Sequence, residues 1–175
     1  LKENILLLEE FAHFQGYPLK LSGADKVLVE QIETLFPGKF TFMPSPPDFD
    51  YIYNTQDLIE LPGKKYHGKR NHINTFSAQH QWQYERIHDG NCADVVKMAK
   101  EWCMLKGNCQ DKGLRSENCA IREALANRDK LSITGGLIRV SGKVVAFTFA
   151  SPINDDIVDI HVEKALPDFA TAYTV

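Results

Sequence analysis

Apolar residues at helical spacing predict helices in the first part of the chain. They recur every three to four positions in residues 2–15, and again after Asp25, so two amphipathic helices are predicted before Pro37. A third helix is predicted over residues 63–80, because Pro62 suits the first helical position. The remaining apolar runs of this part predict three short strands, at residues 17–21, 39–43 and 50–53.

Continuous apolar runs predict a sheet in the second part of the chain. Residues 133–140 and 143–150 are two such runs joined by Ser141 and Gly142, a pattern typical of a β-hairpin. We therefore expect antiparallel strands here, followed by a third strand over residues 157–163. The other predicted elements are a strand at 82–87, helices at 93–106 and about 117–127, and a helix that begins near Phe169.

Strict alternation in the third of these strands separates apolar from polar side chains. It predicts that Val158, Ile160 and Val162 face the core, whereas His161 and Glu163 project together on the other side. A general base has to be a titratable group of this kind, so His161 and Glu163 are the candidate catalytic residues. An exposed polar face of the sheet, or a structural His–Glu pair, is the alternative interpretation.

Charge is unevenly distributed along the chain. The net charge of −3 argues against a general nucleic-acid coat protein, but no acidic residue lies between Glu60 and Glu85. That interval holds the residues that we expect to bind phosphate, namely Lys64, Lys65, Lys69 and Arg70. Tyr, His and Asn side chains stand among these cations, where a solvated helix face normally carries glutamates. A phosphate-bearing ligand is therefore predicted, with a solvated helix face as the alternative.

The composition is that of a globular protein. Hydrophobic residues make up 43% and charged residues 25% of the chain, which excludes a disordered or collagen-like protein. No apolar run approaches the roughly 20 residues of a membrane span, and the first one runs directly into Glu9 and Glu10, unlike a signal peptide. A cytoplasmic protein with four free thiols is predicted. The cysteines form no CxxC pair, so no metal site is predicted.

The order of the predicted elements also indicates a fold. A strand, two helices, three antiparallel strands and a helix open the Gcn5-related N-acetyltransferase (GNAT) fold. An α+β protein is therefore predicted, with helices packed on a largely antiparallel mixed sheet. The GNAT fold continues with a further strand, which splays from its predecessor to form a cofactor cleft. The chain ends at Val175 before such a strand, so we expect it to be part of a longer protein.

Three runs of sequence resemble one family of bacterial proteins. They are Asp50–Asn74, which contains Lys-Lys-Tyr-His, then Gly135–Thr148 and His161–Ala165. Together they are similar to the phosphatidylglycerol lysyltransferase C-terminal-domain-like family, in which two GNAT-like lobes stand in tandem. The resemblance implies part of a first lobe at residues 1–62, a basic connecting helix at 63–80, and a second lobe without its last strands at 81–175.

The resemblance implies an acyl- or aminoacyl-transferase, because studied relatives move an aminoacyl group from tRNA to a lipid head group. GNAT enzymes that use acetyl-CoA carry a glycine-rich turn after the fourth strand, whose N–H groups hold the pyrophosphate. No glycine follows Gly142 in this chain, and Pro167 removes one backbone donor. Aminoacyl-tRNA is therefore favoured over acyl-CoA as the donor substrate, and no other cofactor is predicted.

The implied reaction is direct transfer to an amine or hydroxyl acceptor, without a covalent enzyme intermediate. Glu163 or His161 would act as the base, and the strand at Val162 and Lys164 would hold the donor. The four basic residues would take the phosphates of tRNA or of an anionic lipid head group. One rival hypothesis is a non-catalytic module that uses the basic helix of residues 63–74 to hold RNA, nucleotide or anionic lipid head groups. Another is a domain with a small-molecule pocket.

Overall fold

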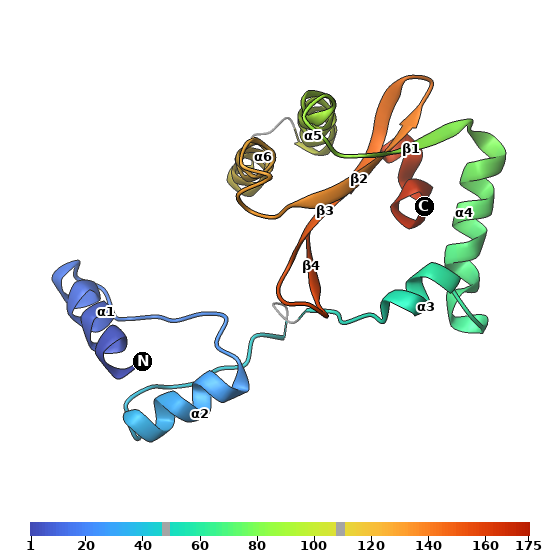
Figure 1. Cartoon of the computed structure of the whole chain (residues 1–175). Coiled ribbons are helices and arrows are strands. Elements are labelled where there is room, and N and C mark those ends of the chain that lie inside the picture. Colours follow the sequence, from blue (N-terminus) through green and yellow to red (C-terminus); the bar gives the residue numbers. More distant parts are fainter. Residues whose placement is uncertain (47–49, 108–110) are drawn as a thin grey trace. The chain divides into compact units, whose positions relative to one another are not determined.

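The computed structural model describes residues 1–46, 50–107 and 111–175. These residues form two compact units, 1–53 and 54–175, which are described separately (Figure 1). Within this chain the predicted basic helix belongs to the same unit as the sheet. The predicted lobes, with their boundary at residue 62, stay a prediction.

The first unit is built from two helices, α1 (Lys2–Phe14) and α2 (Lys26–Leu35). The side chain of Asp25 accepts a hydrogen bond from the Leu28 backbone N–H at 2.7 Å, which begins α2 where the sequence predicts it. The buried residues of this unit's core cluster are Ile5, Ile32 and Phe36. Both helices predicted in this part of the chain are therefore confirmed.

The three short strands predicted in this unit are wrong. Residues 17–21, 39–43 and 50–53 form no strand where the structure describes them. Pro18 and Pro44 lack the N–H that a ladder requires. Moreover, a short apolar run becomes a strand only beside a partner strand, and the described residues of this unit supply none.

Helices carry the basic stretch at the start of the second unit. α3 (Thr55–Glu60) begins at Asn54, whose side-chain oxygen accepts backbone hydrogen bonds from the first turn. The 3-10 helix η2 (Lys64–Tyr66) then leads directly into α4 (His67–Gln79). The third predicted helix is therefore confirmed.

Four strands form one antiparallel sheet in the order in which they occur in the chain. They are β1 (Trp82–Arg86), β2 (Thr134–Val140), β3 (Lys143–Pro152) and β4 (Val158–Ala165). Ser141 and Gly142 have φ values of +49° and +80°, the conformation of a two-residue hairpin turn between β2 and β3. The predicted hairpin, the third strand and the α+β class are confirmed, whereas tandem GNAT-like lobes stay a prediction.

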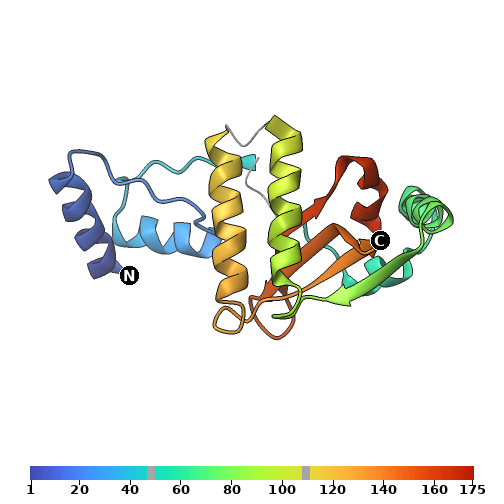
Figure 2. The ribbon, with the colours of Figure 1, turned by 90° about the horizontal axis from the view of Figure 1, so that it is seen from above.

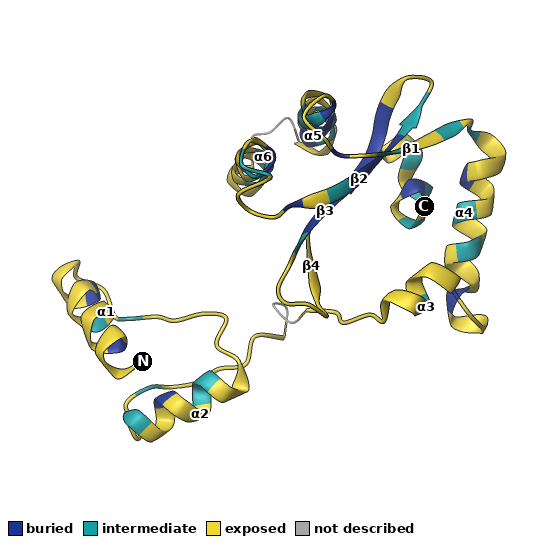
Figure 3. Ribbon diagram, viewed as in Figure 1, coloured by how far each residue is buried: buried dark blue, intermediate teal, exposed yellow. Residues whose placement is uncertain are grey.

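Two long helices cover one face of the sheet. α5 (Cys92–Gly107) and α6 (Lys112–Ala126) lie side by side, and α6 begins earlier than predicted because Asp111 caps it (Figure 2). Buried side chains from both helices pack against β2 and β3, where Figure 3 shows a buried band. This α5–α6 core includes Val95, Met98, Ile121, Leu137, Phe147 and Phe149.

The opposite face is covered by α4 and by the C-terminal 3-10 helix η3 (Pro167–Thr174). Phe76 of α4 is completely buried there. The other buried members of its cluster are Ile138, Val145, Ala146, Ala165 and Ala172. Because both faces of the sheet are packed, side chains that alternate along a strand enter two different environments.

A bulge in β4 overturns the strict alternation that the sequence predicts. The register between β3 and β4 shifts between Phe149 and Ala150, which makes His161 the extra residue. Val158 and Ile160, which were expected to face the core, are 58% and 56% exposed. The sequence pattern cannot reveal a bulge, since the inserted residue is defined only by the pairing with the neighbouring strand.

The cysteines are not all free thiols. Cys92 and Cys119 are free, but Cys103 is disulfide-bonded, so the prediction is wrong for this residue. Cys109 lies outside the described residues. Spacing along the chain cannot show which sulfur atoms the fold brings within bonding distance. The cytoplasmic location stays a prediction.

Candidate functional site

A cavity of about 190 Å³ lies on the face of the sheet that α4 and η3 cover. Gly136 of β2, Thr148 of β3 and Glu163 of β4 contribute to its floor. Tyr84 of β1 and Tyr173 of η3 add two aromatic rings to its lining. All four strands and the C-terminal segment therefore meet around Glu163, one of the two candidate bases.

The floor of this cavity is a row of residues that runs across the sheet. Gly136 pairs with Thr148, and Thr148 pairs with Glu163, so the three positions share one face. The ring of Tyr84 occupies the space above Gly136, and a Cβ at this position would overlap it. Gly135 and Gly136 both lie inside β2. They allow close approach rather than a turn.

The cavity changes the acidity of Glu163. Loss of solvation raises the pKa of this carboxyl group, and the positive charge of Lys69 in α4 offsets part of the increase. The side chain nevertheless remains accessible to solvent, so it can exchange a proton with a ligand. A carboxylate with a raised pKa is a stronger base near neutral pH, and such shifts are typical of functional sites.

Arg70, one of the four predicted phosphate-binding residues, is bound to the protein backbone. Its Nη1 donates hydrogen bonds to the carbonyl oxygens of Leu61 and Gly63, the latter at 2.9 Å. Leu61 ends α3 in the left-handed conformation, with φ at +48°. The guanidinium group therefore fixes the connection between α3 and α4, which leaves less of it to bind a ligand.

The three lysines of the set differ in their partners. Lys65 forms an ion pair with Asp57 (Nζ–Oδ2, 3.1 Å), and this hydrogen bond is the main reason that its pKa is raised. Its ammonium group also lies 4.7 Å from the ring centroid of Tyr66. Lys64 and Lys69 are exposed and form no ion pair with a residue that the structure describes. These two cations are the better placed to meet an anionic ligand.

The structure places His161 in a group of its own. Its Nε2 lies 2.7 Å from Oγ of Ser151, and its Nδ1 lies 3.3 Å from Oδ2 of Asp159. The imidazole centroid is 6.4 Å from that of Phe149, whose ring belongs to the α5–α6 core. His161 and Glu163 therefore contact different residues and do not form the joint site that alternation suggests.

Val162 and Lys164, which were predicted to hold the donor, direct their side chains toward α5 and α6. Val162 packs against the α5–α6 core, and its carbonyl oxygen accepts a hydrogen bond from Thr148 Oγ1 at 3.0 Å. Lys164 is only 3% exposed. Its Nζ lies 2.9 Å from Oε2 of Glu117 and 3.6 Å from the ring centroid of Trp102. This ammonium group is already neutralised inside the protein.

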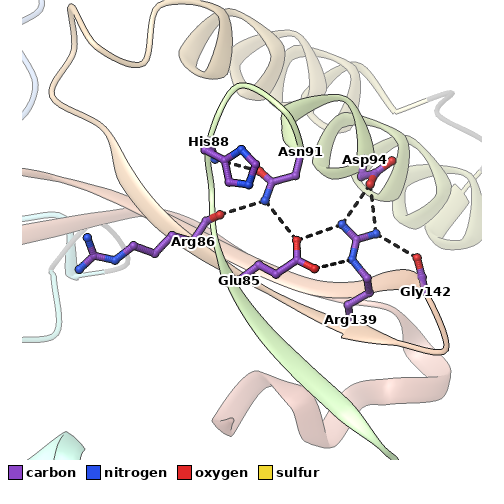
Figure 4. Close-up of polar contacts among 7 residues, drawn as sticks. All are labelled: Glu85, Arg86, His88, Asn91, Asp94, Arg139 and Gly142. Carbon is purple, nitrogen blue, oxygen red and sulfur yellow. Dashed lines mark hydrogen bonds and ion pairs between the residues drawn. The ribbon is translucent and has the colours of Figure 1, made fainter.

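A second polar cluster, shown in Figure 4, connects β1, β2 and α5. Arg139 of β2 donates to Oε1 and Oε2 of Glu85 at 2.8 and 3.1 Å, and to Oδ2 of Asp94 at 3.1 Å. It also donates to the carbonyl oxygen of Gly142 at 2.9 Å. The hydrogen bonds from Arg139 hold the pKa of Glu85 below its ordinary value. Two carboxylates already satisfy this guanidinium group, so the cluster acts as a structural clamp.

Asn91 completes this cluster from the loop before α5. It is 3% exposed, and its Oδ1 accepts a hydrogen bond from the His88 backbone N–H at 2.9 Å. Its Nδ2 donates to the carbonyl oxygen of Arg86 at 2.9 Å and to Oε2 of Glu85 at 3.3 Å (Figure 4). The side chain thus satisfies backbone groups where the chain leaves β1.

Comparison with known proteins assigns the chain to a family. It matches the family described as "Phosphatidylglycerol lysyltransferase, C-terminal" over residues 1–175. The chain belongs to this family. No curated protein matches it.

A solved structure from Bacteroides thetaiotaomicron VPI-5482, described as a conserved protein of unknown function, is also similar to this member of the phosphatidylglycerol lysyltransferase C-terminal family. The two are 34% identical, with a TM-score of 0.87. The match covers 99% of this chain and 59% of the solved chain, so this chain spans less than two thirds of that protein's length.

Sequence reasoning missed part of the site in this family member. Tyr84 and Tyr173 carry no sequence signal, because only the packing of η3 brings them to one cavity. A signal for Gly136 existed, since a glycine pair inside an apolar strand indicates close approach of another group. Among the described residues no group of His, Cys, Asp and Glu could hold a metal ion. No helix in the described ranges is both long and apolar enough to cross a membrane.

Proposed function

We propose that this domain takes part in direct acyl or aminoacyl transfer, with Glu163 as the general base. The observation that carries the proposal is the position of Glu163, a carboxylate of raised pKa that lines a cavity large enough for a small acceptor group. The family assignment supports a transferase-related role. His161, the other predicted base, contacts Ser151 and Asp159 instead.

The proposed step needs no covalent enzyme intermediate. An acceptor amine or hydroxyl enters the cavity beside Thr148 and transfers its proton to the Glu163 carboxylate as it attacks the carbonyl carbon of the donor ester. The bond to the donor's leaving oxygen then breaks, and that oxygen takes up a proton. General-base assistance of this kind typically contributes about 10²–10⁴-fold to the rate.

Aminoacyl-tRNA is the donor that we favour over acyl-CoA. No glycine occurs in the segment that follows β4, where η3 begins with Pro167, so a glycine-rich pyrophosphate turn is not formed by these residues. Lys64 and Lys69 carry exposed ammonium groups near the start of α4, and Lys69 lies close enough to influence Glu163. Phosphate groups of tRNA or of an anionic lipid head group would bind these two lysines first, with Lys65 and Arg70 in supporting positions.

The proposal is tested by measuring transfer with the intact protein. Lysyl-tRNA is supplied as donor and phosphatidylglycerol vesicles as acceptor, with acetyl-CoA as the competing donor. Glu163→Gln should lower kcat by about 10²–10⁴-fold, whereas Glu123→Gln on the exposed surface of α6 should leave it unchanged. Full activity of the Glu163→Gln variant would contradict the assignment of the base.

A non-catalytic binding module is the second candidate, favoured by Lys64 of η2 and Lys69 of α4, which form no ion pair with any residue in the described part of the chain. In that case Lys64→Ala with Lys69→Ala would weaken binding of tRNA or of anionic vesicles and reduce its salt dependence. Glu163→Gln would have no effect on binding, and no transfer would be detected with any donor. The two candidate functions are therefore distinguished by the Glu163→Gln substitution, which should lower the transfer rate in the first case and have no effect in the second.

A further inference from the structure

Ser151, His161 and Asp159 form a chain of hydrogen-bonding distances at the edge of the sheet. Nε2 of His161 lies 2.7 Å from Oγ of Ser151, and Nδ1 lies 3.3 Å from Oδ2 of Asp159. Each ring nitrogen thus faces a different partner. A hydroxyl, an imidazole and a carboxylate in this order are the parts of an activated serine nucleophile.

The β4 bulge creates this arrangement. Ser151 pairs directly with Asp159, and regular pairing of the next residues would place position 160 opposite 150 and 161 opposite 149. The extra residue at His161 instead lets the ring reach back along the strand to Ser151. Bulges often re-aim a side chain in this way. The side chains of His161 and Asp159 are 38% and 50% exposed, so a substrate can approach them from solvent.

The negative charge of Asp159 favours one tautomer of His161. Nδ1 lies 3.3 Å from Oδ2 of Asp159, an ion-pair contact that favours a proton on this nitrogen. With the proton on Nδ1, Nε2 is the acceptor that faces the hydroxyl group of Ser151. The proton of Ser151 therefore has a base within hydrogen-bonding distance, which is the geometric requirement for a nucleophile.

We propose that Ser151 is a second, covalent reaction centre that accepts the acyl group of activated carboxylic esters. Oγ of Ser151 attacks the ester carbonyl carbon while its proton passes to Nε2 of His161. The bond to the leaving oxygen breaks, and this oxygen takes the proton from His161. Water then attacks the acyl-serine, again with His161 as the base, and releases the carboxylic acid together with free Ser151.

This centre is separate from the transfer site proposed above. Glu163 lines the cavity on the face covered by α4 and η3, whereas His161 lies next to Phe149 of the α5–α6 core. Activated esters are the matching substrate class, because a good leaving group lowers the demand for stabilisation of the oxyanion. Asp159 acts as a positioning residue, since it contacts the imidazole rather than the serine.

The test uses the intact protein, a fluorophosphonate probe and p-nitrophenyl acetate. The probe should label Ser151, as located by mass spectrometry of the labelled peptide, and Ser151→Ala should abolish this label. His161→Gln should slow both labelling and ester hydrolysis by about 10²–10⁴-fold. Asp159→Asn should slow them less, through a lower kcat for p-nitrophenyl acetate at an unchanged KM, because Asp159 contacts the imidazole and not the ester.

Two controls keep the inference falsifiable. Ser116→Ala, which removes an exposed hydroxyl on α6, should leave labelling unchanged. Thermal unfolding of every variant confirms that the fold is retained. The proposal would be overturned if the His161→Gln variant were still labelled at the parent rate. It would also be overturned if the parent protein hydrolysed the ester no faster than the Ser151→Ala variant does. In either case the hydrogen-bonded group would only stabilise the β3–β4 edge.

Discussion

The ring of Tyr84 in β1 lies over the Cα of Gly136 in β2, in the space that any side chain at position 136 would fill. Tyr84 is paired with Ile138, so its ring reaches diagonally across the sheet to the glycine. The contact sets the width of the cavity beside Glu163, because both residues line it. A single missing side chain therefore shapes the candidate transfer site.

Gly136→Ala should destabilise the protein by at most about 1 kcal/mol, because the Tyr84 ring that the new methyl group meets is 62% exposed and can turn aside. Urea unfolding measures this loss. Removing the Tyr84 ring should relieve this overlap. The double variant Gly136→Ala/Tyr84→Ala should therefore lose less unfolding free energy than the sum of the losses in the two single variants. Gly68→Ala is the control: this α4 position is open, and alanine there should stabilise the helix by about 0.5–1 kcal/mol. Additive losses would show that the ring does not fill this space.

Glu163→Gln should make the protein more stable near neutral pH, although it should lower transferase activity. The pKa of Glu163 is raised in the folded state, so its stabilising contribution is complete below the pKa of the unfolded chain. That contribution is lost as the pH rises through the folded pKa. The glutamine variant avoids this loss, and the difference in unfolding free energy should vanish below about pH 4. If the variant and the parent differed in unfolding free energy by the same amount at pH 3 and at pH 7, the raised pKa of Glu163 could not be the cause.

Glu85→Gln should show the opposite dependence on pH. The pKa of Glu85 is lowered by its hydrogen bonds from Arg139, so its contribution to stability is present above the unfolded pKa and is lost as the pH falls through the folded pKa. The variant should be less stable than the parent at neutral pH, and the two should converge in acid. Denaturant midpoints across a pH series would test this prediction. Parallel curves at all pH values would show that the clamp in Figure 4 does not depend on the charge.

Arg70→Ala should reduce stability more than phosphate binding, by about 1–3 kcal/mol, because it removes hydrogen bonds to two backbone carbonyl oxygens. Lys64→Ala should do the reverse: surface charges of this kind change stability by less than about 0.5 kcal/mol, while anionic vesicles or tRNA bind more weakly. Urea unfolding and vesicle co-sedimentation separate the two effects. If both variants lost the same amount of binding and kept the stability of the parent, Arg70 and Lys64 would contribute equally to one basic binding face.

Asn91→Ala should cost about 1–3 kcal/mol, since it leaves the His88 N–H and the Arg86 carbonyl oxygen without their side-chain partner in a buried position. Asn118→Ala provides the comparison. Its side-chain hydrogen bond to the Leu114 carbonyl oxygen stays within the same helix, so its replacement by a better helix former should be nearly neutral. Similar midpoints of thermal unfolding for the two variants would argue against a special role of the loop before α5.

Local patterns decided much of the fold. A Ser-Gly pair between two apolar runs is sufficient to predict the β2–β3 hairpin, because the two-residue turn requires positive φ at Ser141 and Gly142. The helix at 63–80 and the α+β class are likewise predicted from patterns among residues that are close together in the sequence. The three false strands show the limit of that information, since the ladder of a strand depends on a partner that lies elsewhere in the chain.

The sequence alone determined the four strands of the sheet and most of the helices, the basic character of η2 and α4, and Glu163 as a candidate base, because each depends on neighbours within a few positions. Only the tertiary structure decided which of these groups can act together. It bound Arg70 to carbonyl oxygens, enclosed Lys164 beside Trp102, and separated His161 from Glu163 through one inserted residue in β4. These contacts depend on the pairing register of the strands and on packing between segments that are distant in the sequence. The alternation of residues along one strand determines neither of them.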